Sequence, residues 1–438
     1  MRRILPPLLL LLVLGWIVAR TLARPSREAA QDRIRGWWEQ TDVATRDRVV
    51  ELTQAYASEF ATEDDRRFAA HAFLRARRVD QAVRARWPRL EGSVDPEEAR
   101  EFAFHALRVL GWDDEACSQP SLQNLQCMLA LLEGGHEPTR RYLDRVVERE
   151  PKETMFQMMR RSMHLRAPAA RAALAAACRR RAASEDARAG AAQGGDPAWS
   201  IAAAQLQLGR TPYPEREADV DLLVSVLEGP FRTQFPPRWM VACRVLGSSE
   251  HPRALEALRS ALARLEAAGG PPDDVVVLRM ALLASGDWAY EDTLRSLFGT
   301  NRTYNHAARA LGPEALLDRL ERRDPRVFPV LGELWQGEGL VSLPVREVLA
   351  RGMLLGPEPP VPELPLDRLL ADLEAPGTPA TLQVVALAWR VRAGAAGSRE
   401  ALLRWLASGQ GNGMGGAADV ERGSAPLVTA LAALYLYR

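Results

Sequence analysis

Residues 237–265 read PRWMVACRVLGSSEHPRALEALRSALARL, a pattern that predicts two helices joined by a short turn. The first helix would carry an apolar face beginning at Trp239. We expect Gly247 to end it, because glycine adopts the left-handed conformation of a helix C-terminus without steric cost. The second helix would begin at Pro252, whose missing N–H does no harm in a first helical turn. Its leucines then fall on one helical stripe, Leu255, Leu258, Leu262 and Leu265, and its charged residues lie off that stripe, Arg253, Glu256, Arg259 and Arg264.

A pair of short amphipathic helices cannot bury its apolar faces alone, so copies of the pair must stack side by side. The chain contains such copies. WSIAA begins at Trp199, and WMVAC begins 40 residues later at Trp239. Residues 278–286 repeat the pattern as LRMALLASG, and residues 307–320 form a compressed copy with its turn at Gly312 and Pro313. More degenerate copies are expected at residues 330–335, 345–355, 366–373, 382–391 and 402–406. The predicted fold class is all-α.

The repeat spacing, together with CRVLG at 243–247 and ARALG at 308–312, resembles HEAT repeats over about residues 196–406. The resemblance is to the short bacterial type named after phycobilisome lyases. It implies a right-handed α-solenoid of stacked helical hairpins, residues 196–408, that binds other proteins. It carries no catalytic residue to transfer, and the sequence has no bilin-site motif onto which the lyase activity could be mapped.

Residues 36–192 form a second predicted region of helical hairpins, similar to tetratricopeptide repeats. FAAHA at 68–72 and FAFHA at 102–106 lie 34 residues apart, which is the period of such repeats. His71 and His105 in these segments could be metal ligands. Each lies in an apolar helical stripe, however, where a packed, hydrogen-bonded histidine is the commoner role. A loop at 111–120, a Met-rich segment at 155–163, an Ala- and Arg-rich helix at 169–192 and a boundary at 193–197 complete this half.

Residues 1–24 have the layout of a signal peptide or signal-anchor. Arg2 and Arg3 precede an apolar segment at 4–19, which as a helix would span about 24 Å, short of the roughly 30 Å hydrocarbon core. The sequence TLA at 21–23 resembles a cleavage site. Residues 25–35 would then be a charged juxtamembrane link, with helices beginning at Trp37. The layout favours a membrane-anchored protein with the bulk of the chain outside the cytoplasm.

The composition is that of an ordinary folded protein, with 47% apolar and 26% charged residues among 438. The net charge of +1 does not favour a nucleic-acid partner. The four cysteines, Cys117, Cys127, Cys178 and Cys243, include no C-x-x-C pair, so we expect no disulfide framework. A single Cys117–Cys127 bridge stays open.

Motifs that would carry chemistry are weak. Gly411, Gly413 and Gly416 satisfy G-x-G-x-x-G, but they would follow a helix where a phosphate-binding loop follows a strand. A Walker A loop, H-E-x-x-H and G-x-S-x-G do not occur. The acidic groups at 64–65, 113–115 and 273–274 are interpreted as helix starts, where carboxylates favourably meet the helix dipole. The basic cluster near Trp87 is interpreted as a solvated helix face, with phosphate or anionic lipid binding as the alternative: Arg75, Arg77, Arg78, Arg84 and Arg86.

We therefore expect no catalytic residues, no metal site and no cofactor. The predicted function is a membrane-tethered protein–protein interaction scaffold. Its partner would be another protein, with no nucleic acid and no small-molecule substrate. The alternatives are an enzyme with a site in the N-terminal helical half, around His71 and His105, and a purely structural envelope protein. A Gly-rich linker at 409–424 would lead to a C-terminal apolar helix at 425–438, which either folds back onto the array or meets a partner.

Overall fold

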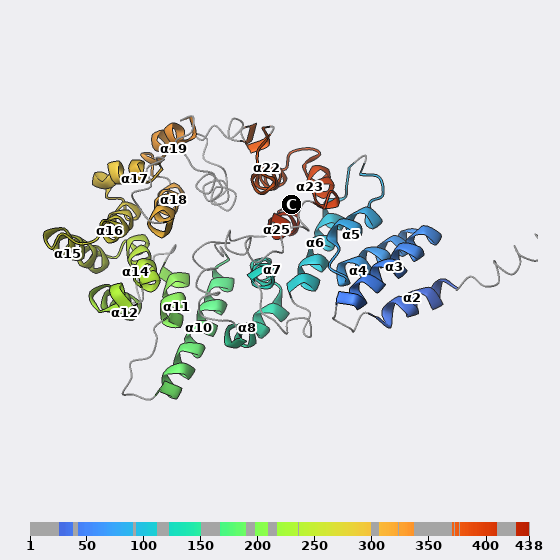
Figure 1. The fold of residues 1–438 in the computed structure, drawn as a ribbon, viewed down its shortest axis with the longest axis horizontal. Coiled ribbons are helices and arrows are strands. Elements are labelled where there is room, and N and C mark those ends of the chain that lie inside the picture. Colours follow the sequence, from blue (N-terminus) through green and yellow to red (C-terminus); the bar gives the residue numbers. More distant parts are fainter. Residues whose placement is uncertain are drawn as a thin grey trace, which may run out of the picture. The chain divides into compact units, whose positions relative to one another are not determined.

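Every regular element in the described residues is helical, which confirms the predicted all-α fold (Figure 1). The computed structural model describes residues 26–37, 43–90, 93–111, 122–149, 167–189, 198–208, 217–234, 236–298, 306–322, 324–336, 370–371, 373–375, 377–409 and 426–437. The predicted signal-anchor, the Met-rich segment, the boundary at 193–197 and the Gly-rich linker beyond residue 409 lie outside these ranges.

The chain forms two compact units. Unit 1 comprises Met1–Leu90 with Ala407–Asn412, and unit 2 comprises Glu91–Leu406 with Gly413–Arg438. The helices of unit 1 are α2 (Arg27–Arg35), α3 (Val43–Glu59), α4 (Glu63–Arg75) and α5 (Val79–Arg86). This division falls elsewhere than the predicted boundary at 193–197, since helices on both sides of that boundary pack together, α10 against α11.

Unit 2 contains all the other described helices. They are α6 (Pro96–Gly111), α7 (Leu122–Glu133), α8 (Glu137–Arg149), α10 (Pro168–Ala189), α11 (Ala198–Leu208), α12 (Glu217–Glu228), α13 (Phe231–Gln234), α14 (Pro236–Ser249), α15 (Pro252–Ala267), α16 (Pro272–Ala284), η2 (Trp288–Tyr290), α17 (Glu291–Phe298), α18 (His306–Glu321), α19 (Val327–Gln336), α22 (Ala380–Arg392), α23 (Ser398–Ala407, its last residue in unit 1) and α25 (Pro426–Leu436).

The hairpin predicted at 237–265 is present as α14 and α15. The second helix begins at Pro252, as predicted. Leu258 and Leu262 are buried, and all four charged residues named from the sequence are exposed. Trp239 is 2% exposed and its indole Nε1 donates a hydrogen bond to the carbonyl of Leu227 at 3.3 Å. The leucine stripe of α15 and Trp239 of α14 therefore predicted which faces of these two helices are buried.

The prediction that Gly247 ends the first helix was wrong. The helix α14 continues to Ser249, and Gly247 faces the neighbouring helix α16 instead. A Cβ atom at this position would lie 2.1 Å from the carbonyl oxygen of Ala281. Glycine is required because the two helix backbones approach too closely for any side chain. The turn itself follows at Glu250, which has a φ of 53°.

The turn predicted at Gly312 and Pro313 was also wrong. Helix α18 runs without interruption from His306 to Glu321 and contains Pro313 in its interior. A proline there forfeits a backbone hydrogen bond and strains the helix. Every residue from 311 to 320 is buried, so packing around the whole helix outweighs this local cost.

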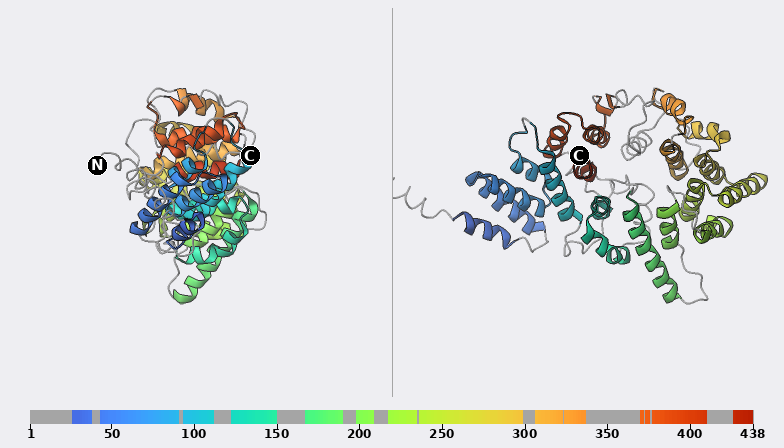
Figure 2. Two further views of the ribbon diagram at one scale, coloured as in Figure 1. Left: turned by 90° about the vertical axis from the view of Figure 1, so that its right-hand side faces the viewer. Right: turned by 180° about the vertical axis from the view of Figure 1, so that it is seen from behind.

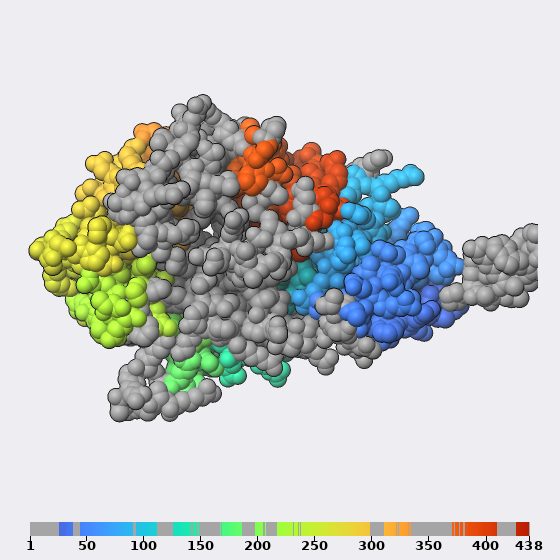
Figure 3. Space-filling view, viewed as in Figure 1, coloured from blue at the N-terminus to red at the C-terminus, as the bar shows by residue number. Residues whose placement is uncertain are grey.

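The helices of this part of unit 2 form two rows. In the first row α14 lies between α11 and α16, and α16 packs in turn against α18. In the second row α12 packs against α14 and α15, and α17 packs against α16 and α18 (Figures 1 and 2). First-row helices are buried almost all round, as at residues 239–248 of α14. The second-row helices α12 and α15 lie at the surface (Figure 3, lime to yellow), and their charged residues are exposed.

The C-terminal apolar helix is present as α25 and folds back within unit 2. It packs against α6, α7 and α22. The ring of Tyr435 lies against Gly134, where a Cβ atom would be 2.2 Å from the ring, and the Tyr435 hydroxyl donates to the Gly134 carbonyl at 3.3 Å. Arg100 Nε donates to the Tyr435 carbonyl at 3.1 Å. Helices more than 300 residues apart in the sequence are thereby held together.

The segment at 25–35, predicted as a link with helices beginning only at Trp37, contains the helix α2. Ser26 forms its N-cap, with the side-chain oxygen accepting from the Ala29 N–H at 3.2 Å. Ile34 is 1% exposed. The composition of the segment is mostly polar, but the helix packs on α3. Gln31 Nε2 donates to the Tyr56 hydroxyl of α3 at 2.7 Å, and Arg27 pairs with Asp65 of α4.

We expect Gly247→Ala to lower the free energy of unfolding by at least about 2 kcal/mol, because the added methyl group forces two helix backbones apart. The control is Gly36→Ala, where φ is −59° and the nearest atom to the added Cβ would be 3.5 Å away. Urea unfolding followed by circular dichroism measures both. Equal stabilities of the two variants would contradict the close approach at Gly247.

Candidate functional site

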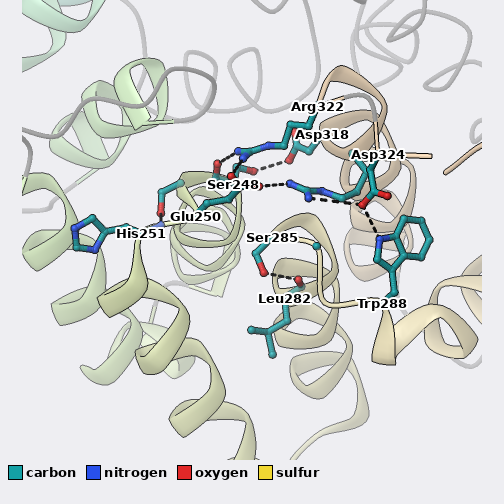
Figure 4. A network of polar contacts seen from close by, with 12 residues as sticks. Ser248, Glu250, His251, Leu282, Ser285, Trp288, Asp318, Arg322 and Asp324 are labelled. Carbon is teal, nitrogen blue, oxygen red and sulfur yellow. Dashed lines mark hydrogen bonds and ion pairs between the residues drawn. The ribbon is translucent and has the colours of Figure 1, made fainter. Parts of the chain in front are cut away.

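A network of polar contacts in unit 2 lies at the C-terminal ends of α14, α16 and α18 (Figure 4). Helix C-termini present carbonyl groups without intrahelical donors and carry partial negative charge. Arg319 and Arg322, in and just after the last turn of α18, supply cations and N–H donors at this place. From this position the two arginines reach residues near the ends of the preceding helices α14 and α16.

Arg319 is the central side chain of the network and is only 6% exposed. Its Nη2 lies 2.6 Å from Glu250 Oε1, and its Nη1 lies 3.9 Å from Asp324 Oδ2. A Cβ atom on Gly286, whose φ is 102°, would lie 2.8 Å from Nη1. Glycine at position 286 therefore adopts the positive φ of the turn after α16 and also leaves space for the Arg319 guanidinium.

A second arginine binds the same carboxylate. Arg322 forms an ion pair with Glu250 and donates a hydrogen bond to the carbonyl oxygen of Ser248. The Ser248 hydroxyl donates in turn to Asp318 Oδ2 at 2.5 Å, and both of these residues are 4% exposed. Together with the Arg319–Glu250 pair, these contacts join the end of α14 to the end of α18 at four points.

Asp324 connects the network to the turn after α16. It accepts a hydrogen bond from Trp288 Nε1 at 2.8 Å and pairs with Arg326 at 3.0 Å. The Arg326 guanidinium also lies 5.2 Å from the centre of the Trp288 ring. Burial opposes ionisation of the carboxyl, but the hydrogen bonds from Arg326 and Trp288 outweigh it and lower the pKa of Asp324 to about 2.

The charges of this network balance, since three guanidinium groups face three carboxylates. An added anion would have to displace one of these carboxylates. The network also lacks a Ser–His–Asp relay, in which an imidazole lies between hydroxyl and carboxylate. His251 pairs with Glu217 at 3.1 Å, away from Ser248. The arrangement therefore serves to clamp helices together.

A second buried ion pair lies between the same two helices. Arg244 Nε of α14 lies 3.2 Å from Glu314 Oε2 of α18, and the two side chains are 10% and 8% exposed. Arg244 and Ser248 are four residues apart, as are Glu314 and Asp318, so each pair lies on one helical face. The polar link between the helices thus extends over about one further turn.

The basic cluster predicted near Trp87 has partners within unit 1. Arg84 donates to the Ala407 carbonyl at 2.9 and 2.6 Å, and Arg78 pairs with Asp80 at 3.3 Å. Arg86 pairs with Glu63 and is 7% exposed. The interpretation as a solvated helix face was wrong for Arg86, because its guanidinium is buried where α4 and α5 pack together.

The two histidines of the FAAHA and FAFHA segments belong to different units. His71 lies on α4 in unit 1, and His105 lies on α6 in unit 2. The His105 ring contacts Phe104 at 5.6 Å between centroids and lies 3.8 Å from Glu101. Burial and the nearby Arg108 lower the pKa of His105. In the described ranges, no group of three or more His, Cys, Asp or Glu side chains is arranged to hold a metal ion.

The acidic pairs lie at helix starts, as predicted. Asp64 and Asp65 are in the first turn of α4, where Asp65 completes a capping box with Thr62. Asp273 and Asp274 are in the first turn of α16. The group at 113–115 lies outside the described residues.

The cysteines of the described ranges are buried. Burial raises the pKa of Cys178 to about 12 and that of Cys243 well above its usual value. Cys127 is also buried, and Cys117, its proposed disulfide partner, lies outside the described residues. Thiols such as Cys178 and Cys243 are inert because the reactive thiolate is disfavoured.

Sequence reasoning did not single out the members of the network in Figure 4. Arg319 and Glu250 are 69 residues apart, and Arg322 and the Ser248 carbonyl are 74 apart. The available local signal was charge at helix ends, in SSE before His251 and in ERRDPR at 321–326. Charged residues at helix ends indicate helix capping, but they do not identify the distant residues with which they form ion pairs.

Compared with protein-family models, with curated proteins and with solved structures, the chain matches none of them. The resemblance to HEAT repeats therefore stays a prediction. Within the described ranges, no helix is both long enough and apolar enough to cross a bilayer.

We expect Arg319→Met to lower the free energy of unfolding by about 2–4 kcal/mol, since it leaves Glu250 and Asp324 without this buried partner. The matched control is Arg253→Met, which removes an arginine that is 55% exposed from its pair with Asp221. We expect that change to stay within about 0.5 kcal/mol, as is usual for exposed pairs. Urea denaturation measures both, and similar losses would contradict the special role of the buried Arg319 guanidinium.

The low pKa of Asp324 predicts a defined pH dependence. A carboxyl whose pKa is lowered from about 3.9 in the unfolded chain stabilises the fold above about pH 4, and this contribution is lost as pH falls through 2. We expect wild type to lose about 1–2 kcal/mol more than Asp324→Asn between pH 5 and pH 2. Urea unfolding at several pH values measures the difference. A gap between the two proteins that stays constant with pH would contradict it.

Proposed function

We propose that this protein is a membrane-tethered scaffold for protein–protein interaction, built as a solenoid of stacked helical hairpins. Residues 1–24 provide the tether, and the bulk of the chain lies outside the cytoplasm. The proposal assigns no reaction to the protein. It is supported by the helical pairs of unit 2 and, above all, by the spacing of the contacts between them.

The observation that carries the proposal is a set of charged pairs about one repeat apart. Arg179 pairs with Asp219 across 40 residues, Arg232 with Asp274 across 42, and Arg295 with Glu333 across 38. Further pairs connect neighbouring helices at somewhat shorter separations of 36, 32 and 36 residues: Arg180 with Asp144, Arg253 with Asp221 and Arg264 with Glu228. The repeat of 39–40 residues in the sequence recurs as a repeat of contacts, which is what stacked hairpins require.

Burial favours the second row as the binding surface. The first-row helices α14, α16 and α18 are buried almost all round, and polar side chains such as Arg244 and Glu314 pair with one another between them. Helices buried in this way belong to a core. The helix α15 instead exposes Glu256, Arg259 and Ser260. A partner protein would therefore contact the charged outer faces of α12, α15 and α17, through an interface more polar than a protein core.

The test is affinity purification of the full-length chain from detergent-solubilised membranes. We expect a partner protein to be recovered with wild type, and at least about tenfold less of it with Glu256→Arg and Ser260→Arg combined, because two cations are added to the proposed surface. The control is Glu137→Arg combined with Glu148→Arg, two exposed positions on α8.

Circular dichroism must show that both variants are as helical as wild type. No partner above background would contradict the scaffold. A partner lost equally in both variants would contradict the assignment of the surface to α15.

A further inference from the structure

We propose that α15 pairs in antiparallel orientation with α15 of a second copy of this chain, about a two-fold axis at Ser260. The pairing depends on Glu256 and Arg264, because each would face the oppositely charged residue of the other copy. This inference rests on the proposed function for its choice of surface, and it names a second copy of the chain as the occupant of α15.

The outer face of α15 is open to a partner. The helix packs against α12, α14 and α16, and its Leu258 and Leu262 are buried. The opposite face lies at the surface of unit 2 (Figure 3). Its exposed residues recur at intervals of three and four along the helix and therefore share one face. They are Arg253, Glu256, Ser260, Ala263, Arg264 and Ala267.

The charges of this face are arranged symmetrically about Ser260. Glu256 lies four residues before Ser260 and Arg264 lies four residues after it, which is about one helical turn in each direction. Within the part of the chain that the structure describes, Glu256 forms no ion pair. Arg264 lies 3.8 Å from Glu228, and both of these side chains are more than half exposed. Both charges are therefore accessible to a second molecule.

Two-fold symmetry leaves few ways to pair this face with itself. In a parallel pair Glu256 would face Glu256, and Arg264 would face Arg264, so like charges would repel. In an antiparallel pair with its axis at Ser260, Glu256 of each copy faces Arg264 of the other. An axis one turn earlier or later would bring Glu256 or Arg264 against itself. The charges therefore select both the direction and the register of the pairing.

Side-chain size permits the two helices to approach. Ser260 at the axis is small, and so are the exposed Ala263 and Ala267 beside it. Packed helices lie about 8–10 Å apart, and each Cα atom lies about 2.3 Å from its helix axis, so the two Ser260 Cα atoms would be about 3.4–5.4 Å apart. A single helix of 16 residues offers less area than the roughly 800 Å² per partner of a standard interface. We therefore expect a dimer that dissociates at micromolar concentration.

The first experiment is disulfide cross-linking of the full-length chain in detergent. Ser260→Cys places one thiol of each copy at the axis, at a Cα separation that overlaps the range of about 4.4–6.8 Å found in disulfides. The matched control is Ala267→Cys on the same face, where the two thiols would be about 21 Å apart along the helix axis. The chain without either substitution controls for the native cysteines, of which Cys127, Cys178 and Cys243 are buried.

We expect Ser260→Cys to form the cross-linked dimer at least about tenfold faster than Ala267→Cys under mild oxidation. Collisions between copies would oxidise both exposed positions at similar rates, so the difference reports the register of the pair. Equal rates at the two positions, or no cross-link at Ser260→Cys, would overturn the pairing.

The second experiment reverses the charges and measures the oligomeric state by equilibrium sedimentation in detergent, at up to about 100 μM chain. Glu256→Arg alone and Arg264→Glu alone each place like charges across the axis, so we expect each variant by itself to be monomeric where wild type is dimeric. Mixed together, the two variants regain both opposite-charge contacts, and we expect a dimer with one copy of each. Association in the mixture also shows that the single variants are folded.

Two outcomes of the sedimentation would overturn the pairing: wild type that stays monomeric at every concentration, and a mixture that stays monomeric. The purification described above is a separate measurement. Recovery of a different partner protein by a monomeric wild type would overturn the pairing and leave the scaffold intact. A wild-type dimer that recovers no other protein would support the pairing and contradict a scaffold for other proteins.

Discussion

The close approach of α14 and α16 at Gly247 is the constraint on which the surrounding structure depends. A backbone distance that leaves no room for a Cβ atom fixes how the two helices cross. It also places the residues after Gly247, the end of α14, beside the ends of α16 and α18. Ser248 and Glu250 thereby come within reach of Arg322 and Arg319. The polar clamp in Figure 4 is a consequence of this backbone contact.

Apolar burial and charge have different roles in unit 2. The first-row helices supply the hydrophobic stabilisation, since α14, α16 and α18 are buried almost all round. The exposed ion pairs between helices, such as Arg180 with Asp144, contribute only about 0–1 kcal/mol each. These pairs favour one stacking of the helices over others. Each arginine faces an acidic residue about one repeat away, so a shifted stacking would separate the opposite charges.

Both ends of the described chain are fixed by contacts of long sequence range. Tyr435 of α25 lies against Gly134, and Arg100 donates to its carbonyl. Arg27 of α2 reaches the buried Asp65. Repeat arrays commonly end in hairpins with a polar outer face. In unit 2 the last helix is instead apolar, with nine of its eleven residues buried, and so it must be covered by earlier helices.

The sequence alone determined the helical class, the hairpin at 237–265, the start at Pro252 and the exposure of the charged residues of α15, because these depend on periodicity and on local capping. It misjudged Gly247 and the Gly312–Pro313 pair, since the helix-breaking cost of glycine and proline, about 1 and about 3 kcal/mol, is local and burial of a whole helix exceeds it. It also missed the helix at 27–35, which exists only through its neighbours. Only the tertiary structure decided which carboxylate each arginine meets, because Arg319 and Glu250 are 69 residues apart and no local pattern records such a distance.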